Sequence, residues 1–166
     1  MKAQSCTKAL LTLTSFTLLL LTLPSQGHAG PGGWDQTYAP TVTRGAVNAM
    51  TLQPDGRLLI GGDFTAVNNS SSRSRLARLF ADGALDSSFL NAGAGVSDTI
   101  WCLAIQADGR IVIGGNFTTV TGTPRNRVAR LNSNGTVVGS FIPTNTINIS
   151  VLAVAAQSDN KVIIGG

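Results

Sequence analysis

A short block of sequence occurs three times in this chain, and its recurrence restricts the fold to an array of repeated units. The block reads Gln-Pro-Asp-Gly-Arg, an aliphatic triplet and then Gly-Gly-Asp-Phe-Thr at residues 53–65. Close copies follow at residues 106–118 and 157–166, so the copies begin 53 and then 51 residues apart. A period of this length is typical of proteins in which each repeat forms one small sheet.

Each copy carries the sequence pattern of a tight β-hairpin. An Asp-Gly pair between two apolar runs favours a hairpin turn, because the turn needs a positive φ that glycine adopts without steric cost. In the third copy Asn160 replaces the glycine. Asparagine visits the left-handed region more readily than most other residues. We therefore expect the same turn in all three copies.

Each unit contains four strand candidates. In the first unit they are residues 47–52, 58–62, 76–80 and 85–89. A second Asp-Gly hairpin at residues 82–83 joins the last two candidates. The aliphatic triplets are apolar on both faces, which indicates sheets that are covered on both sides by neighbouring sheets. Four short antiparallel strands per repeat predict the blades of a β-propeller, and hence an all-β fold.

The order of these blocks resembles the bacterial delta-60 repeat family of β-propeller proteins. After the first block come Arg-Leu-Ala-Arg-Leu and Asp-Gly-Ala-Leu-Asp-Ser-Ser-Phe, and the likeness covers residues 34–166. The resemblance implies a secreted or surface-attached propeller, usually one module of a larger protein, without an assigned activity. The repeats are not identical, since Asp86 of the first unit becomes Val138 in the second.

Residues 30–166 contain about two and a half blades. They begin with the last strand of one blade, expected at residues 34–38, and they end within another blade. Propellers close with four to eight blades. We therefore expect a partial β-propeller that is a fragment of a longer chain. The alternative is a short array that assembles into a closed ring.

Residues 1–29 have the pattern of a secretory signal peptide. Lys2 and Lys8 provide a positive start, residues 9–23 are apolar, and Gly-His-Ala at residues 27–29 is a small-x-small cleavage site. The apolar run is shorter than a membrane span requires. An uncleaved membrane anchor is the alternative. The expected product is a secreted or cell-surface domain of residues 30–166 with no stable membrane span.

The chain lacks most of the side chain types on which enzyme catalysis depends. The chain has no glutamate, its one histidine lies in the expected signal, and Cys102 is the one cysteine that remains after cleavage. These facts exclude Ser-His-Asp triads, Cys-His nucleophiles and His/Cys zinc sites. We therefore expect Cys102 to be a small packed residue and the protein to be neither an enzyme nor the holder of a cofactor.

Aspartates are the remaining carboxylates, and turn geometry explains Asp55, Asp82 and Asp108. Calcium bound at such turns is the alternative, although the Asp-x-Asp-x-Asp-Gly spacing is missing. After signal removal, ten basic residues face eight aspartates without a basic cluster. We therefore expect no nucleic-acid partner.

Two loops are candidates for a binding surface. Residues 68–74 and 121–126 follow the same strand in successive units, so they should emerge on one rim of the propeller, where recognition is common. The candidate rim residues are Asn68, Asn69, Arg73, Arg75, Thr121, Arg125 and Asn126.

Arg78 and Arg130 occupy the same place in successive units. They could form a ring of guanidinium groups that grips an anionic ligand. The alternative is a structural role, such as an ion pair with Asp86.

These observations together predict a non-catalytic module for binding or structural interaction. Its partner would be a protein or glycan, with further propeller blades supplied in cis or by oligomerisation. A carbohydrate-binding lectin and the scaffold of a larger exported enzyme, with its catalytic part elsewhere, are the alternatives.

Overall fold

The computed structural model describes residues 40–70, 73–90, 95–143 and 147–166. Every regular element in these segments is a β-strand, so the predicted all-β class is confirmed. The described residues contain no helix, and hence none that could cross a membrane. The expected signal at residues 1–29 and the expected strand at residues 34–38 lie outside the described residues.

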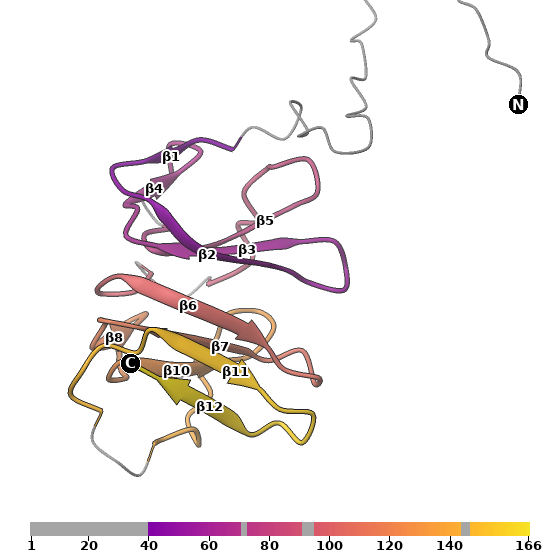
Figure 1. Cartoon of the computed structure of the whole chain (residues 1–166). Coiled ribbons are helices and arrows are strands. Elements are labelled where there is room, and N and C mark those ends of the chain that lie inside the picture. Colours follow the sequence, from indigo (N-terminus) through magenta and orange to yellow (C-terminus); the bar gives the residue numbers. More distant parts are fainter. Residues whose placement is uncertain (1–39, 71–72, 91–94, 144–146) are drawn as a thin grey trace, which may run out of the picture.

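Three antiparallel sheets follow one another along the chain (Figure 1). The first has the order β2 (Val47–Leu52), β3 (Leu58–Gly62) and β5 (Leu76–Leu79). The second has the order β6 (Ile100–Ile105), β7 (Ile111–Gly115) and β10 (Val128–Leu131). The third pairs β11 (Ala153–Ala156) with β12 (Val162–Gly165). Strand β6 contacts both β2 and β11, which is how successive blades pack in a propeller.

The repeated turns adopt the conformation that the sequence predicts. Gly56 and Gly109 have φ angles of 81° and 79°, and Asn160 has a φ of 63°. In each turn the aspartate accepts a hydrogen bond from the backbone N–H two residues later, at 3.1 Å in all three copies. The third copy therefore keeps the turn although its glycine is lost.

The fourth strand of each unit, predicted at residues 85–89 in the first, does not form. Leu85 makes a single bridge to Leu79, and the chain then turns. The same backbone turn forms in both units, since the N–H of Phe89 donates to the carbonyl of Asp86 and the N–H of Phe141 to that of Val138, each at 3.3 Å. In the first unit the Oδ1 of Asp86 reinforces the turn by accepting hydrogen bonds from the backbone N and the Oγ of Ser88, at 2.9 and 2.6 Å. The turn places Phe89 in the core rather than on a sheet.

Two further differences concern strand ends and small sheets. Strand β5 stops one residue before the predicted end at Phe80, because the N–H of Phe80 donates across the turn to the carbonyl of Ala84. The sequence pattern also missed two short ladders beside the main sheets. These are β1 (Val42–Thr43) with β4 (Ala66–Val67), and β8 (Thr119–Val120) with β9 (Thr123–Pro124).

One hydrophobic core joins the first two sheets. Leu59 and Phe89 of the first unit pack in one cluster with Ile111 and Ile113 of the second, and all four are fully buried. The prediction that the aliphatic triplets are covered on both faces holds for these units. In the third unit Ile163 is 56% exposed, because the described residues supply no sheet beyond β12.

The Gly-Gly pairs mark points where backbones meet, as the sequence suggests. A Cβ on Gly62 would lie 2.0 Å from the carbonyl oxygen of Ala46, and one on Gly115 would lie 2.1 Å from that of Thr99. A Cβ on Gly61 would lie 2.8 Å from a side-chain atom of the second sheet. The missing side chain of the first glycine leaves room for the next sheet, and that of the second leaves room for the neighbouring strand of the same sheet.

Candidate functional site

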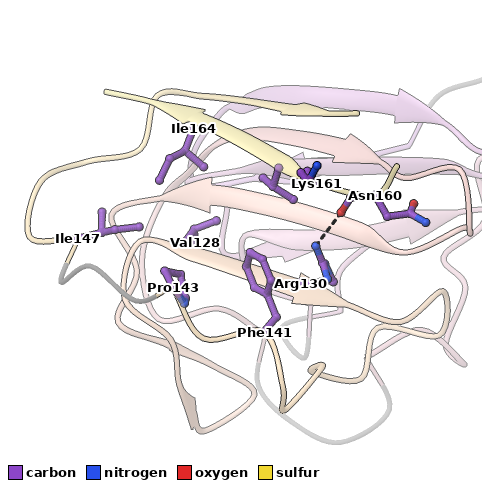
Figure 2. Close-up of a pocket in the computed structure, with 9 residues that line it drawn as sticks. Val128, Arg130, Phe141, Pro143, Ile147, Asn160, Lys161 and Ile164 are labelled. Carbon is purple, nitrogen blue, oxygen red and sulfur yellow. Dashed lines mark hydrogen bonds between the residues drawn. The ribbon is translucent and has the colours of Figure 1, made fainter. Parts of the chain in front are cut away.

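A pocket of about 450 Å³ lies between the second sheet and β12 (Figure 2). Its walls are mostly apolar, with two cationic side chains among them. The lining residues are Val128, Arg130, Phe141, Pro143, Ile147, Asn160, Lys161, Val162 and Ile164. A concave apolar site with a few polar groups is the usual form of a small-molecule site.

Arg130 is the main polar group of this pocket. Strand β10 carries it, and its Nη2 donates a hydrogen bond to the backbone carbonyl of Asn160 at 3.0 Å (Figure 2). Its guanidinium carbon lies 4.3 Å from the ring centroid of Phe141. Its Nε is buried and has no hydrogen-bond partner. The second cation, Lys161, is already paired, with its Nζ 2.7 Å from Asp159 Oδ2.

The equivalent arginine of the first unit is in a different electrostatic environment. Arg78 Nε lies 2.9 Å from Asp86 Oδ2, and both side chains are almost fully buried. The guanidinium carbon also stacks 4.6 Å from the ring centroid of Phe89. The structural ion pair considered from the sequence is therefore present. Arg78 is not free to bind an external anion.

The pKa of Asp86 lies below its ordinary value. Burial acts to raise this pKa, and the hydrogen bonds from Ser88 together with the bond to and charge of Arg78 lower it by more. The carboxylate is thus ionised at neutral pH, and it balances the charge of the buried guanidinium.

The second unit has lost this balance. Position 138, which corresponds to Asp86, holds valine, whereas the arginine and its stacked aromatic ring are retained. Among the described residues, no carboxylate forms an ion pair with Arg130. The pocket therefore contains a guanidinium group whose charge is not compensated.

The candidate rim arginines are bound to nearby backbone. Arg73 Nη2 donates to the carbonyl of Ser87 at 2.8 Å, and Arg75 Nη1 donates to that of Val96 at 3.1 Å. Arg125 Nη2 donates to that of Val138 at 3.2 Å. These arginines hold the loops in place. Strands β4 and β8, which precede the two loops, lie on the same side of the array (Figure 1).

The other rim candidates do not gather into one cluster with Arg130. Asn68 is tied to its surroundings, since its Nδ2 donates to the carbonyl of Gly83 at 3.0 Å. Asn69 lines a separate hollow of about 490 Å³ beside β1 and β4, together with Arg44. Asn126 is exposed to solvent. Thr121 has a positive φ of 47°, and its backbone N–H donates to the carbonyl of Gly95.

The aspartates of the described segments are used in local structure. Each of the seven accepts a hydrogen bond from a backbone N–H. They are Asp55, Asp63, Asp82, Asp86, Asp98, Asp108 and Asp159. Within these segments no three side chains of the His, Cys, Asp or Glu type come together as metal ligands would. Such aspartates serve as turn formers.

The sequence analysis found Arg130 but missed the pocket. Phe141 lines it from the second unit, whereas Lys161 and Ile164 line it from the hairpin of the third, and only the fold brings the two sides together. One sequence observation could have located it. The replacement of Asp86 by Val138 at a repeat-equivalent position removes a partner from Arg130.

Comparison with known proteins supports the repeat assignment. A family described as "Domain of unknown function (DUF5122) beta-propeller" matches the chain at residues 53–89 and 106–146. These segments contain the first two copies of the block and the strands that follow them. None of the curated proteins compared with the chain matches it. The chain is therefore a β-propeller protein that holds part of a propeller.

Proposed function

We propose that this chain is an exported, non-catalytic propeller module of the delta-60 type, which acts by binding and structural interaction. The observation that carries this proposal is that all seven described aspartates are engaged in local hydrogen bonds. Since glutamate is absent from the sequence and its histidine lies in the proposed signal, no carboxylate or imidazole is left poised for acid–base chemistry. The proposed signal at residues 1–29 directs the protein to the outside of the cell or to its surface.

We further propose that the flanks of the array contact other propeller blades. The packing inside the molecule provides the pattern. At each contact between sheets a glycine of one sheet faces branched side chains of the next. Gly61 faces Ile100, and Gly114 faces Val151 and Val154. We call the face that a sheet turns toward the preceding sheet its leading face, and the opposite face its trailing face. Large residues on the leading face of one sheet thus fill the space left by small residues on the trailing face of the sheet before it.

The two outer flanks of the described array have the same complementary character. On β2, Met50 and Leu52 are 65% and 66% exposed. Their repeat equivalents, Leu103 and Ile105, pack against the core. On the third sheet the exposed trailing face carries the small residues Ala153, Ala155 and Gly165, with Ile163 beside them. Burying a side chain the size of Met50 or Leu52 is worth about 1.5–3 kcal/mol. The leading flank of one copy therefore fits the trailing flank of another.

Sedimentation velocity of the purified protein over a range of concentrations tests this contact. We expect concentration-dependent assembly, and we expect Met50→Asp/Leu52→Asp to be monomeric. Ala107→Asp/Ser158→Asp, which adds the same charge at exposed turns, is the matched control and should assemble. A wild-type protein that stays monomeric at every concentration would rule out assembly through the flanks. Export is tested separately by N-terminal sequencing of the secreted product, which should begin after Ala29.

A further inference from the structure

We propose that the exposed indole of Trp101 is a binding platform for a neutral oligosaccharide. A pyranose ring of this ligand stacks on the indole face, and its hydroxyl groups bond to the amide side chains beside it. This site deepens the proposed binding role and rests on it. Its support comes from the place of Trp101 in the fold, from the groups that hold its ring and from the chemistry of its surroundings.

Trp101 leaves the regular pairing of its sheet at a β-bulge. The pairing of β6 with β7 shifts register between Ile100 and Cys102, so Trp101 is the extra residue, and β2 has the same bulge at Asn48. Bulges redirect a side chain and are common beside active sites. The bulge residue is Asn48, Trp101 and Leu152 in the three units, whereas the residue before it is always valine or isoleucine and the residue after it is always alanine or cysteine. The fold therefore does not prescribe this side chain.

Trp101 stays exposed although the neighbouring sheets on both sides are present. Strand β6 lies between β2 and β11 and contacts both of them (Figure 1), yet Trp101 is 38% exposed. Phe80 is the other exposed aromatic residue of the described segments, also at 38%. Arg57 lies over the ring of Phe80, with its guanidinium carbon 5.3 Å from the centroid. In these segments no guanidinium lies over the indole of Trp101, so its face is open to a ligand.

Two amide side chains lie beside Trp101. The indole Nε1 donates a hydrogen bond to Oδ1 of Asn116 at 3.2 Å, which restrains the ring. From the first unit, Nδ2 of Asn48 donates to the carbonyl of Ile100 at 3.1 Å, and this carbonyl belongs to the peptide that precedes Trp101. A ring that is held before binding loses less conformational freedom when a ligand arrives. The structure thus places an aromatic face beside amides from two successive units.

These groups match the chemistry of a sugar. The face of an aromatic ring carries partial negative charge, and it attracts the C–H groups on one side of a pyranose ring with equatorial hydroxyls. An asparagine amide contains both donors and an acceptor, which suits hydroxyl groups that are themselves both. A stable protein partner would cover about 800 Å² and use several buried anchors, whereas one indole has the area of one sugar ring. An oligosaccharide is therefore the ligand that this platform fits best.

Titration of the purified protein with cellotetraose and with N-acetylchitotetraose, followed by two-dimensional NMR, tests the platform. Both probes are neutral chains of β-linked rings with equatorial substituents. We expect at least one of them to cause saturable shifts of the Trp101 indole N–H and of the side-chain amides of Asn48 and Asn116. The dissociation constant should be in the millimolar range, as for other small ligands on open surfaces. Sorbitol has similar hydroxyl groups without a ring face, and it should cause no saturable shift.

The decisive variant is Trp101→Leu, because the third unit already holds leucine at this position, as Leu152. We expect it to weaken binding of the sugar about tenfold, since the stacking face is lost. Trp101→Tyr keeps an aromatic face and should bind within about fivefold of wild type. Phe80→Leu is the matched control, because it removes an aromatic residue of equal exposure, and a distant site should leave binding within about twofold of wild type. The NMR spectrum of each variant shows directly whether it is folded.

Undiminished sugar binding by a folded Trp101→Leu variant would overturn the proposal, and so would equal shifts with sorbitol. Absence of binding by both sugars would refute the platform, and alongside assembly through the flanks it would leave the proposed function intact with a protein as its partner. Hydrolysis of either sugar during the titration would instead contradict the non-catalytic function.

Discussion

Arg78 and Asp86 form a buried ion pair in which Nε and Oδ2 are 2.9 Å apart, and the same carboxylate shapes the chain around it. Its other oxygen, Oδ1, accepts hydrogen bonds from the backbone N and the Oγ of Ser88. Asp86 therefore neutralises the guanidinium that stacks on Phe89 and also reinforces the turn that carries this ring into the core. One side chain connects the electrostatics of the unit to its packing.

Removing this carboxylate should destabilise the fold strongly. In Asp86→Ala the buried guanidinium of Arg78 loses its counter-ion, and the turn loses its acceptor. Breaking a buried pair in this way costs about 3–5 kcal/mol. Urea denaturation measures the free energy of unfolding directly. Asp55→Ala is the control, because it also removes the acceptor of a turn, but its carboxylate is half exposed and lies 3.7 Å from Arg57. A pair of this kind contributes about 0–1 kcal/mol. Equal losses in the two variants would contradict the account.

The stability that Asp86 provides should depend on pH in one direction. The pKa of this carboxyl is lower in the folded protein than its ordinary value of 3.8. A depressed pKa means that the stabilisation is present above pH 3.8 and is lost as the pH falls through the folded pKa. The difference in unfolding free energy between wild type and Asp86→Asn should therefore be constant near neutral pH and shrink in acid. Denaturation curves between pH 7 and pH 2 measure it, and a difference that grows in acid would refute the assignment.

The repeat made the main sheets predictable, whereas the pocket required the fold. The Asp-Gly turns and aliphatic triplets were sufficient to place β2 and β3 at their observed bounds, because the turn chemistry and the apolar run that follows it are local features of the sequence. The expected fourth strand failed because a backbone turn follows a single bridge in both units, at residues 86–89 and 138–141, which strand propensity does not capture. The pocket depends on contacts between residues such as Phe141 and Ile164 that are distant in sequence.

A methyl group at Gly62 should be far more damaging than its size suggests. The added Cβ would lie 2.0 Å from the backbone carbonyl oxygen of Ala46, and backbone cannot move aside without breaking the β2–β3 ladder. We expect Gly62→Ala to lose about 3 kcal/mol or more, at the upper end of the cost of overpacking. Gly139→Ala is the matched control, since its Cβ would meet nothing within 4 Å. Thermal unfolding compares the two, and a Gly62→Ala variant as stable as wild type would show that the strands are not held this close.

Repeat-equivalent valine and isoleucine side chains should differ in energetic value between units. Val112 is fully buried, whereas Ile163 at the same place in the third unit is 56% exposed. Val112→Ala removes two buried methyl groups and should cost about 1.5–3 kcal/mol. Ile163→Ala should cost less than about 1 kcal/mol in the monomer. Urea denaturation at low protein concentration, where assembly is weak, makes the comparison. Equal costs would indicate that the trailing face is already covered.

Cys102 is the one cysteine in the described part of the chain. We expect its thiol to react slowly as a nucleophile. Burial raises the pKa of this thiol to about 11 from an ordinary 9.0, and the hydrogen bond from the backbone of Gly114 offsets only part of the effect. At pH 7 the thiolate fraction is then about 100-fold lower than that of a free cysteine, and the thiolate is the reactive form. A thiol reagent such as dithionitrobenzoate should therefore react with the folded protein at least about 100-fold more slowly than with the protein in urea.

Because Ala49 and Ala153 occupy the equivalent places in the other units, Cys102→Ala should fold normally, and it serves as the blank that assigns any residual reaction. Rapid modification of the folded wild type would show that the thiol is exposed and ionised, and would contradict the packed role predicted for it.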